Sequence, residues 1–483
     1  MKTLLVIVAL AACEPPQLTA KTPDWVSDTT AYGPNTTQAT GVADRYRATA
    51  LAIIAAAQKD RGAFTKLAEL TDTIGHRLAG SPELDRAIAW AAAAMKADGM
   101  EVHTEKVMVP HWVRGIEEAQ VVAPQARTLH LIGLGGSVAT PKGGITAPLV
   151  VVHDWAELDA KKEHVKGAIV LFDVAMPPYT EKDGTHYGTV VEYRFGGATE
   201  ASKRGAVAML VRSVTATSLG TPHTGALGYA DGATKIPAAA VTVEDAELLD
   251  RMATRGAVTV HLRLDDQMLP DVESANVIGE LVGKDKPDEI VVIGGHIDSW
   301  DVGQGAHDDG AGIVTMMEAV RVLKQLKLQP RRTIRVVLFT NEENGVRGAK
   351  AYAEAHQAEL ARHVLAVESD SGGFWPRGFS TGHKDPEAGK RVRARIAEIT
   401  SLLAPIHATH VGAGHGGTDI GPMESAGVPQ LGLEVDTSHY FDYHHTEADT
   451  LDKVDPRQLA DDVAAVAVLA YVVADLPDRV DAP

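Results

Sequence analysis

The sequence predicts an α/β protein whose mainly parallel central sheet is interrupted by an inserted β-rich segment. From residue 274 onward, apolar strand-like runs alternate with amphipathic helical runs, as in parallel sheets covered by helices on both faces. Residues 120–268 instead carry short strand-like runs separated by glycine-rich turns. A chain of 483 residues is also too long for one hydrophobic core. We therefore expect a main domain over residues 45–119 and 269–478 and an inserted domain over residues 120–268.

The elements of the main domain can be assigned in order along the chain. The run "SPELDRAIAWAAAAMKADG" predicts a helix with Ser81 as its N-cap, Pro82 at its first position and Gly99 after its end. The expected strands that follow are "EIVVIGG", "RTIRVVLFT", "HVLAVES" and "PQLGLEV", and the expected helices are Ala311–Leu326, Val346–His356, Glu387–Leu403 and one from about Pro456.

In the inserted segment, residues 120–268, shorter strand-like and helical runs alternate along the chain. Runs such as "GAIVLFD", "VAMLVRS" and "VTVHLRL" predict strands, and "FGGATEASKRG" and "VEDAELLDRMATRG" predict helices between them. The segment is either a separate β-rich domain or a continuation of one large sheet.

The composition is that of a globular protein without affinity for nucleic acid. Hydrophobic residues make up 45% of the chain and charged residues 23%. The net charge is −18, and the sequence has no basic stripe to displace counterions from phosphates. We therefore expect no nucleic-acid partner.

The first residues, "MKTLLVIVALAACEPP", have the pattern of an export signal. Lys2 precedes an apolar run that is too short to cross a bilayer as a helix. "LAAC" resembles the bacterial lipobox, so we expect residues 1–12 to be removed and Cys13 to be lipidated, with residues 13–44 as a tether. The alternative is an ordinary export signal with a chance cysteine. Both interpretations predict an exported protein, either lipid-anchored in the bacterial cell envelope, on the periplasmic or outer-membrane side, or secreted, and only the lipid anchor would contact a membrane.

Acidic residues and histidines follow four of the expected strands, where each strand ends. They are His296, Asp298, Asp308 and Asp309, then Glu342 and Glu343, then Asp370, and finally Asp436, His439, His444 and His445. Because the carboxyl ends of parallel strands meet at one edge of a sheet, these charges would repel one another without a cation between them. Imidazole and carboxylate oxygens are good zinc ligands, and the candidates exceed the three of a one-zinc catalytic site. The sequence therefore predicts two zinc ions that share one carboxylate. A single aspartate at a strand end is more often a helix cap, as Asp309 illustrates.

Four motifs carry a resemblance to a known family. "GGHIDSWDVGQGAHDDGAG", "FTNEENGVRGA", "VESDSG" and "YHHTEADT", in this order, resemble the di-zinc exopeptidases of the aminopeptidase and glutamate carboxypeptidase type. "HIDSWDVGQGA" and "HGGTDI" are similar to the branch of plasma glutamate carboxypeptidase, also called carboxypeptidase Q. The resemblance covers most of residues 45–475 and implies a three-layer zinc-exopeptidase fold with a protease-associated-like inserted domain. It also implies two zinc ions per chain, short peptide substrates such as unblocked dipeptides, and a homodimer.

The resemblance also implies a role for each matching residue. The zinc ligands would be His296, Asp308, Glu343, Asp370 and His445, with Asp308 shared between the ions. Glu342 would be the general base, and Asp298 would orient His296 or polarise the site. His415 either stabilises an oxyanion, binds a substrate carboxylate or is an ordinary loop histidine. Asp419 either binds a substrate amine or has no such role.

These observations favour a zinc-dependent exopeptidase. One alternative is a glutaminyl cyclase-like acyltransferase with a single zinc ion. The HxD element and the intact "NEE" both argue against it, because they favour two ions. The other alternative is a receptor-like binding ectodomain without catalysis. Every matched position holds a residue that can bind metal, which argues against this one. Side-chain preference, and the choice between aminopeptidase, carboxypeptidase and dipeptidase action, stay open.

Overall fold

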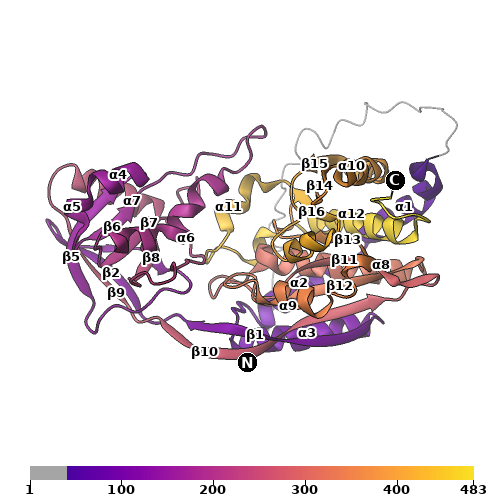
Figure 1. Cartoon of the computed structure of the whole chain (residues 1–483), viewed down its shortest axis with the longest axis horizontal. Coiled ribbons are helices and arrows are strands. Elements are labelled where there is room, and N and C mark those ends of the chain that lie inside the picture. The colour runs from indigo at the N-terminus through magenta and orange to yellow at the C-terminus, as the bar shows by residue number, and fades with distance from the viewer. Residues whose placement is uncertain (1–40, 483) are drawn as a thin grey trace, which may run out of the picture. The chain divides into compact units, whose positions relative to one another are not determined.

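The computed structural model describes residues 41–482, and within them the strands form two eight-stranded sheets (Figure 1). The order of the first sheet is β1-β10-β12-β11-β13-β16-β14-β15. Its strands are β1 (Glu101–Val113), β10 (Gln267–Leu281), β11 (Lys286–His296), β12 (Arg332–Phe339), β13 (His363–Glu368), β14 (Pro376–Gly382), β15 (His410–Ala413) and β16 (Gln430–Val435). Strands β12, β11, β13 and β16 run parallel at its centre, and antiparallel pairs flank them. The predicted α/β fold with a mainly parallel central sheet is confirmed.

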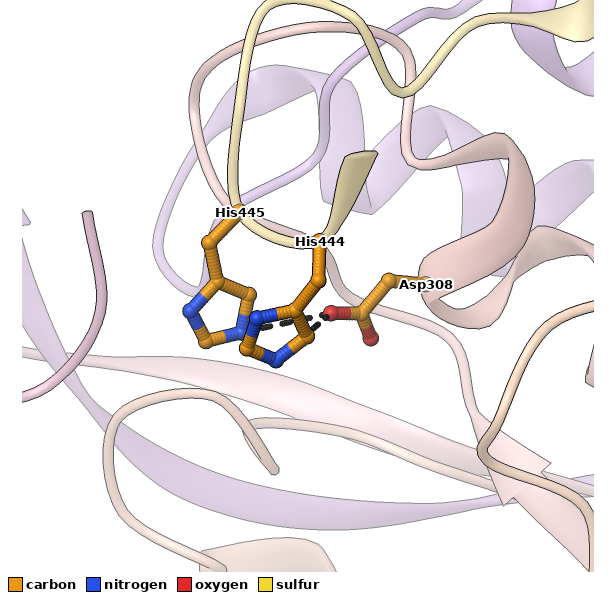
Figure 2. A group of neighbouring side chains, drawn as sticks. All are labelled: Asp308, His444 and His445. Carbon is orange, nitrogen blue, oxygen red and sulfur yellow. Dashed lines mark ion pairs between the residues drawn. The ribbon is translucent and has the colours of Figure 1, made fainter. Parts of the chain in front are cut away.

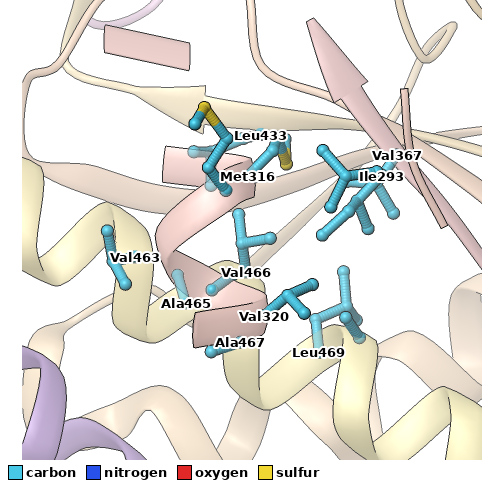
Figure 3. Packing of buried hydrophobic residues seen from close by; sticks show 14 of the residues in the cluster. Ile293, Met316, Val320, Val367, Leu433, Val463, Ala465, Val466, Ala467 and Leu469 are labelled. Atoms are coloured by element: carbon cyan, nitrogen blue, oxygen red, sulfur yellow. The ribbon is translucent and has the colours of Figure 1, made fainter. Parts of the chain in front are cut away.

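Helices cover both faces of the first sheet, because its strand residues alternate between two apolar clusters. Ile293 of β11 joins a cluster with Val320 of α8 (Gly312–Gln325) and Val466 of α12 (Pro456–Asp475), and Figure 3 shows these side chains. Val292, the preceding residue, belongs to a different cluster that includes Tyr352 of α9 (Arg347–Ala355). The helices of this part are α1 (Val42–Lys59), α2 (Gly62–Thr73), α3 (Pro82–Ala97), α8 (Gly312–Gln325), α9 (Arg347–Ala355), α10 (Pro386–Thr400), α11 (Tyr440–Tyr443) and α12 (Pro456–Asp475). Ser81 caps α3 as predicted, since its side chain accepts a hydrogen bond from the backbone N–H of Leu84.

Residues 117–264 form the second sheet with its own apolar clusters, and we call this part the inserted lobe. Its strand order is β3-β2-β9-β5-β6-β7-β8-β4. The strands are β2 (Glu117–Ala123), β3 (Arg127–Leu129), β4 (Leu131–Gly133), β5 (Ile145–Val152), β6 (Ile169–Phe172), β7 (Ala208–Arg212), β8 (Ala238–Val241) and β9 (Thr259–Leu264), and the helices are α4 (Trp155–Ala160), α5 (Lys162–Val165), α6 (Tyr187–Lys203) and α7 (Val243–Ala253). The antiparallel strands β1 and β10 lead into and out of the lobe, pairing from Glu101↔Glu280 to Val113↔Gln267.

The predicted signal segment, residues 1–12, lies outside the described residues, as do Cys13 and most of the predicted tether. Among the helices of residues 41–482, none combines the length and the apolar character needed to span a bilayer.

Candidate metal centre

The five side chains predicted as metal ligands lie together beyond the carboxyl ends of neighbouring strands. His296 ends β11, and Glu343 follows β12, which pairs with β11 in parallel. Asp370 follows β13 on the other side of β11, and His445 lies in the loop after β16. Asp308 precedes α8 in the turn that leads from β11 into that helix. The strand order therefore brings together residues that are distant in the sequence.

Asp308 lies between two histidines and contacts each through a different oxygen. Its Oδ1 atom is 3.2 Å from Nε2 of His296, which is 3.4 Å from Oδ1 of Asp370. Its Oδ2 atom is 3.2 Å from Nε2 of His445, which is 3.2 Å from Oε2 of Glu343. Asp308 thus joins two groups of contacts, one with His296 and Asp370 and one with His445 and Glu343. Ligand atoms of His296, Asp308 and Glu343 also lie within 4.8 Å of one another, as do those of Asp308, His444 and His445.

Both imidazole rings present the same nitrogen to this carboxylate. Nδ1 of His296 is 3.1 Å from the carbonyl oxygen of Asp298, and Nδ1 of His445 is 3.2 Å from the carbonyl oxygen of Thr224. Because a carbonyl oxygen can only accept a hydrogen bond, Nδ1 is the donor to it in each ring, and Nε2 is the nitrogen that faces the Asp308 carboxylate. Nε2 is therefore the atom of each ring that would bind a metal.

The donors fit a pair of divalent cations. Each group combines imidazole nitrogen with carboxylate oxygen and has no thiolate, a set that suits zinc. Oε1 of Glu343 is buried and has no hydrogen-bond partner among the described residues. A cation would supply the interaction that this buried oxygen lacks.

The centre also concentrates buried negative charge. Burial and the charge of Asp308 raise the pKa of Glu343 to about 7. Burial raises the pKa of Asp370 and raises that of Glu342 well above its usual range. Burial opposes ionisation of Asp308 too, but hydrogen bonds with His296 and His445 hold its pKa well below the usual range. Divalent cations would relieve the repulsion among these groups.

Asp298 connects a histidine of the centre with Glu342. Its carbonyl accepts the hydrogen bond from His296, and its Oδ1 atom accepts one of 3.0 Å from the backbone N–H of Glu342. Glu342 and Glu343 are consecutive, but their carboxylates have different neighbours. Glu343 contacts His445, whereas no histidine of the described residues lies within 4.0 Å of the Glu342 carboxylate. Glu342 is therefore left for a role other than pairing with a histidine.

Figure 2 shows that the adjacent histidines His444 and His445 both face Asp308, but their distances to its carboxylate differ. Nε2 of His444 is 3.8 Å from Oδ2 of Asp308, while the corresponding distance for His445 is 3.2 Å. The two rings stack with centroids 3.5 Å apart. Burial, with the charge of His445, lowers the pKa of His444 well below its usual range, so its ring is neutral. The geometry favours His445 as the ligand.

Two further aspartates hold the backbone of the centre. Asp309 accepts hydrogen bonds from the backbone N–H groups of His296 and of Gly312, the first residue of α8, whereas the N-cap position of that helix is Ala311. Asp449 accepts hydrogen bonds of 2.7 and 3.1 Å from the backbone N–H groups of His307 and Asp308. Sequence reasoning missed Asp449, although it lies in the "HTEADT" motif.

A cavity of about 690 Å³ lies over the centre and reaches the inserted lobe. Its lining includes Glu342, Asp370 and His415 from the first part of the molecule and Tyr187 and Arg194 from the lobe. A neighbouring cavity of about 930 Å³ shares Asp370 and His415 with it. His415 is thus placed to contact a molecule held in either cavity.

The second weak candidate, Asp419, is not in the lining of these cavities. Its side chain is fully buried, and neither carboxylate oxygen has a hydrogen-bond partner within the described part of the chain. The backbone N–H of Asp419 donates to Glu368, which also accepts hydrogen bonds from Thr418 and Ile420. Glu368 therefore anchors the loop that carries His415.

Arg194 is a feature of the cavity that sequence reasoning missed. Its side chain is buried, and its guanidinium donates to the hydroxyl of Tyr187 at 2.8 Å and to the carbonyl of Thr224 at 3.4 Å. Its Nε has no hydrogen-bond partner, and no carboxylate of residues 41–482 forms an ion pair with it. The sequence around Arg194, which follows "THYGTVV" in a helical run, does not indicate that its side chain is buried without a carboxylate partner.

The sequence profile of Peptidase family M28 matches residues 276–470. The chain is 43% identical over 417 residues to carboxypeptidase Q of Mus musculus, and the match spans 86% of each protein. The chain belongs to peptidase family M28. Carboxypeptidase Q of Homo sapiens is 42% identical over 418 residues, again with 86% of each protein covered.

Solved structures of M28 peptidases share the fold. The Peptidase M28 precursor from Shewanella amazonensis SB2B superposes with a TM-score of 0.85 at 37% identity, covering 90% of this chain and 98% of that one. A zinc aminopeptidase from Bacillus subtilis has a TM-score of 0.62 at 21% identity over 85% of this chain and 94% of its own. The resemblance and the fold class that the motifs predict are confirmed.

Proposed function

We propose that this protein is a metallo-exopeptidase that uses two zinc ions to hydrolyse short peptides. Membership of peptidase family M28 and the likeness to carboxypeptidase Q support the reaction class. The observation that carries the two-ion proposal is the position of Asp308, which offers one oxygen to each of two donor groups. His296 and Asp370 would hold one ion, Glu343 and His445 the other, and Asp308 both. When bound, the zinc ions would polarise the peptide carbonyl and acidify the attacking water.

Glu342 is the proposed general base. It lines the cavity beside Asp308, and Asp298 fixes its backbone through the bond to its N–H group. In this position Glu342 accepts a proton from the attacking water and returns it to the amine that leaves. Asp298 also holds the ring of His296, so a single residue positions both a ligand and the base.

Arg194 favours substrates with a free carboxylate. A buried guanidinium without an anionic partner is costly, and a carboxylate can pair with it through two parallel hydrogen bonds. A peptide whose C-terminal carboxylate binds Arg194 would extend across the metal centre, and the neighbouring cavity gives room for its N-terminal side. The proposed substrates are therefore dipeptides and short peptides that lose their C-terminal residue.

The test is digestion of a dipeptide library by the purified protein, read by mass spectrometry. Cleavage should stop with chelator and return with zinc. Glu342→Gln keeps the shape of the side chain and should reduce kcat by about 100- to 10,000-fold while zinc still binds. Turnover that is insensitive to chelator, or full activity in Glu342→Gln, would refute the proposal.

A second comparison tests the substrate class. Arg194→Met should lower kcat/KM for free dipeptides by roughly 10- to 100-fold, because a hydrogen-bonded charge pair is lost. The same variant should hydrolyse dipeptide amides as well as the unaltered protein does. Equal losses on both substrates would contradict carboxylate recognition by Arg194.

Three finer features belong to the same proposal. Residues 120–268 form a separate protease-associated-like domain, which the sheet and the apolar clusters of the inserted lobe support. The protein is exported and is lipidated at Cys13, which the "LAAC" sequence supports. The resemblance supports a homodimer, and sedimentation of the purified protein tests it.

A further inference from the structure

We propose that the inserted lobe completes the metal centre, because the backbone of Thr224 orients the ligand His445. This inference rests on the proposed metal-binding function of His445. It concerns the chain's own contacts to that ring.

The two histidines of the centre take their second hydrogen bond from different parts of the molecule. The partner of His296 is the carbonyl of Asp298, only two residues further along the same loop. The partner of His445 is the carbonyl of Thr224, which belongs to the inserted lobe. Such partners fix the tautomer and the orientation of a metal-binding ring. The orientation of the His296 ring is thus fixed by a residue of its own loop, and that of the His445 ring by a residue of the inserted lobe.

The contact between Thr224 and His445 is reciprocal. Nδ1 of His445 donates to the Thr224 carbonyl at 3.2 Å, and the backbone N–H of Thr224 donates to the carbonyl of His445 at 3.0 Å. This pair of bonds fixes both the ring and the backbone of His445 against the lobe. A shift of this part of the lobe therefore has to move the ring or break the bond to Nδ1.

Thr224 is itself held firmly. Its side chain is fully buried, and its hydroxyl donates to the carbonyl of Gly133 at 2.8 Å. Its carbonyl also accepts the bond of 3.4 Å from Arg194. One carbonyl oxygen therefore joins a metal ligand to the arginine proposed to bind the substrate carboxylate.

Other contacts hold the lobe near this loop without touching the His445 ring. Tyr187 stacks on Phe441 with centroids 4.7 Å apart, and Thr217 donates to Asp442. Of the lobe residues described, Thr224 is the one whose hydrogen bond reaches Nδ1 of a proposed ligand. The orienting role is thereby assigned to Thr224.

Gly225 offers a way to disturb the Thr224 carbonyl selectively. The two residues share a peptide group, and Gly225 has a φ of +140°, a backbone conformation that L residues rarely adopt. Relief of this backbone strain in Gly225→Ala should rotate the peptide group away from His445, while the guanidinium of Arg194, 2.4 Å from the new Cβ, moves aside. Gly232→Ala is the matched control, because Gly232 in the same lobe also has a positive φ, of +73°, but a Cβ there would meet nothing within 4 Å.

The experiment is titration of each metal-free protein with zinc alone, with two dissociation constants resolved by chelator competition. Gly225→Ala should weaken the binding of one zinc ion by roughly 10- to 100-fold, which is the loss of affinity typical when the hydrogen-bond partner of a metal ligand is removed. The affinity for the other ion should not change. Gly232→Ala should bind both as the unaltered protein does. The inference would be overturned if both zinc dissociation constants of Gly225→Ala were unchanged, or if both ions were bound equally more weakly.

Hydrogen exchange of the unaltered protein gives a second reading that does not depend on a variant. Zinc should slow exchange of the Thr224 amide and leave amides in β5 and β6 unchanged. Exchange of Thr224 that does not respond to zinc would also overturn the inference. If the unaltered protein binds no zinc at all, it is the proposed function that fails.

Discussion

The carboxylate of Asp308 lies 3.2 Å from Nε2 of His445, although the two residues belong to distant segments that meet only at the edge of the sheet. The other oxygen of Asp308 has the same distance to His296. A buried carboxylate that is shared in this way between two imidazole nitrogens is suited to bridging two cations.

Zinc should stabilise the folded protein, because the donor groups come together only in the folded chain. At a free zinc concentration of 100 times the dissociation constant, each site should add about 2.7 kcal/mol to the free energy of unfolding. Thermal unfolding with zinc and with chelator measures the effect, and Asp308→Asn is the variant in which it should be largely lost. A melting temperature that does not respond to zinc would contradict the assignment of this centre.

The loop that carries His415 should depend on the close approach of Gly417 to Glu368. A Cβ at Gly417 would lie 2.3 Å from the Glu368 carboxyl carbon, and the φ of Gly417 is +152°. Gly417→Ala should therefore displace the loop and raise KM for dipeptides several-fold. Gly421→Ala is the control, since a Cβ there would meet nothing within 4 Å. Similar kinetics for the two variants would count against an active role of this loop.

Stability should fall with rising pH through the titration of Asp461 on α12. Burial raises the pKa of Asp461 from 3.8 to about 6, so the folded state binds this proton more tightly than the unfolded state. The stabilisation is complete below about pH 4 and is lost as pH rises through 6, a change of ~3 kcal/mol.

Asp461→Asn tests that titration, because it keeps the oxygen that accepts the 2.9 Å bond from Gln58. Urea unfolding should show the variant more stable than the unaltered protein at pH 8 and nearly equal at pH 4. A difference between the two proteins that does not change with pH would show that Asp461 does not titrate in this way.

Cys13 should carry a lipid when the gene is expressed in a bacterium with lipoprotein processing. The unaltered protein should incorporate labelled fatty acid and sediment with membranes, whereas Cys13→Ser should do neither. The variant should keep its peptidase activity, because the described metal centre lies far along the chain from residue 13. An unlabelled, freely secreted unaltered protein would favour the ordinary export signal.

The parts of the fold that could be predicted from sequence are those with local signals. The capped helix that begins at Pro82 and the apolar strand that ends at His296 both have patterns of their own. Strand β1 has no such pattern, because only three of its 13 residues are buried and its pairing partner, β10, lies far along the chain. Such a strand depends on a long-range partner that local patterns do not reveal.

The candidate site divides in the same way. His296 and Asp370 could be proposed because each follows a recognisable strand within a recognisable motif. Arg194 and Thr224 could not, because their importance comes from burial and from backbone contacts across the lobe. A backbone carbonyl carries no residue-type signal, so no spacing in the sequence points to Thr224.

The proposed two-zinc centre can be tested by titrating the metal-free protein with zinc while dipeptide hydrolysis and bound zinc are measured together. Activity should rise to its maximum as the second equivalent of zinc per chain is bound, and Glu342→Gln should bind the same two equivalents with little activity. Full activity at one equivalent, or in the protein without zinc, would contradict it.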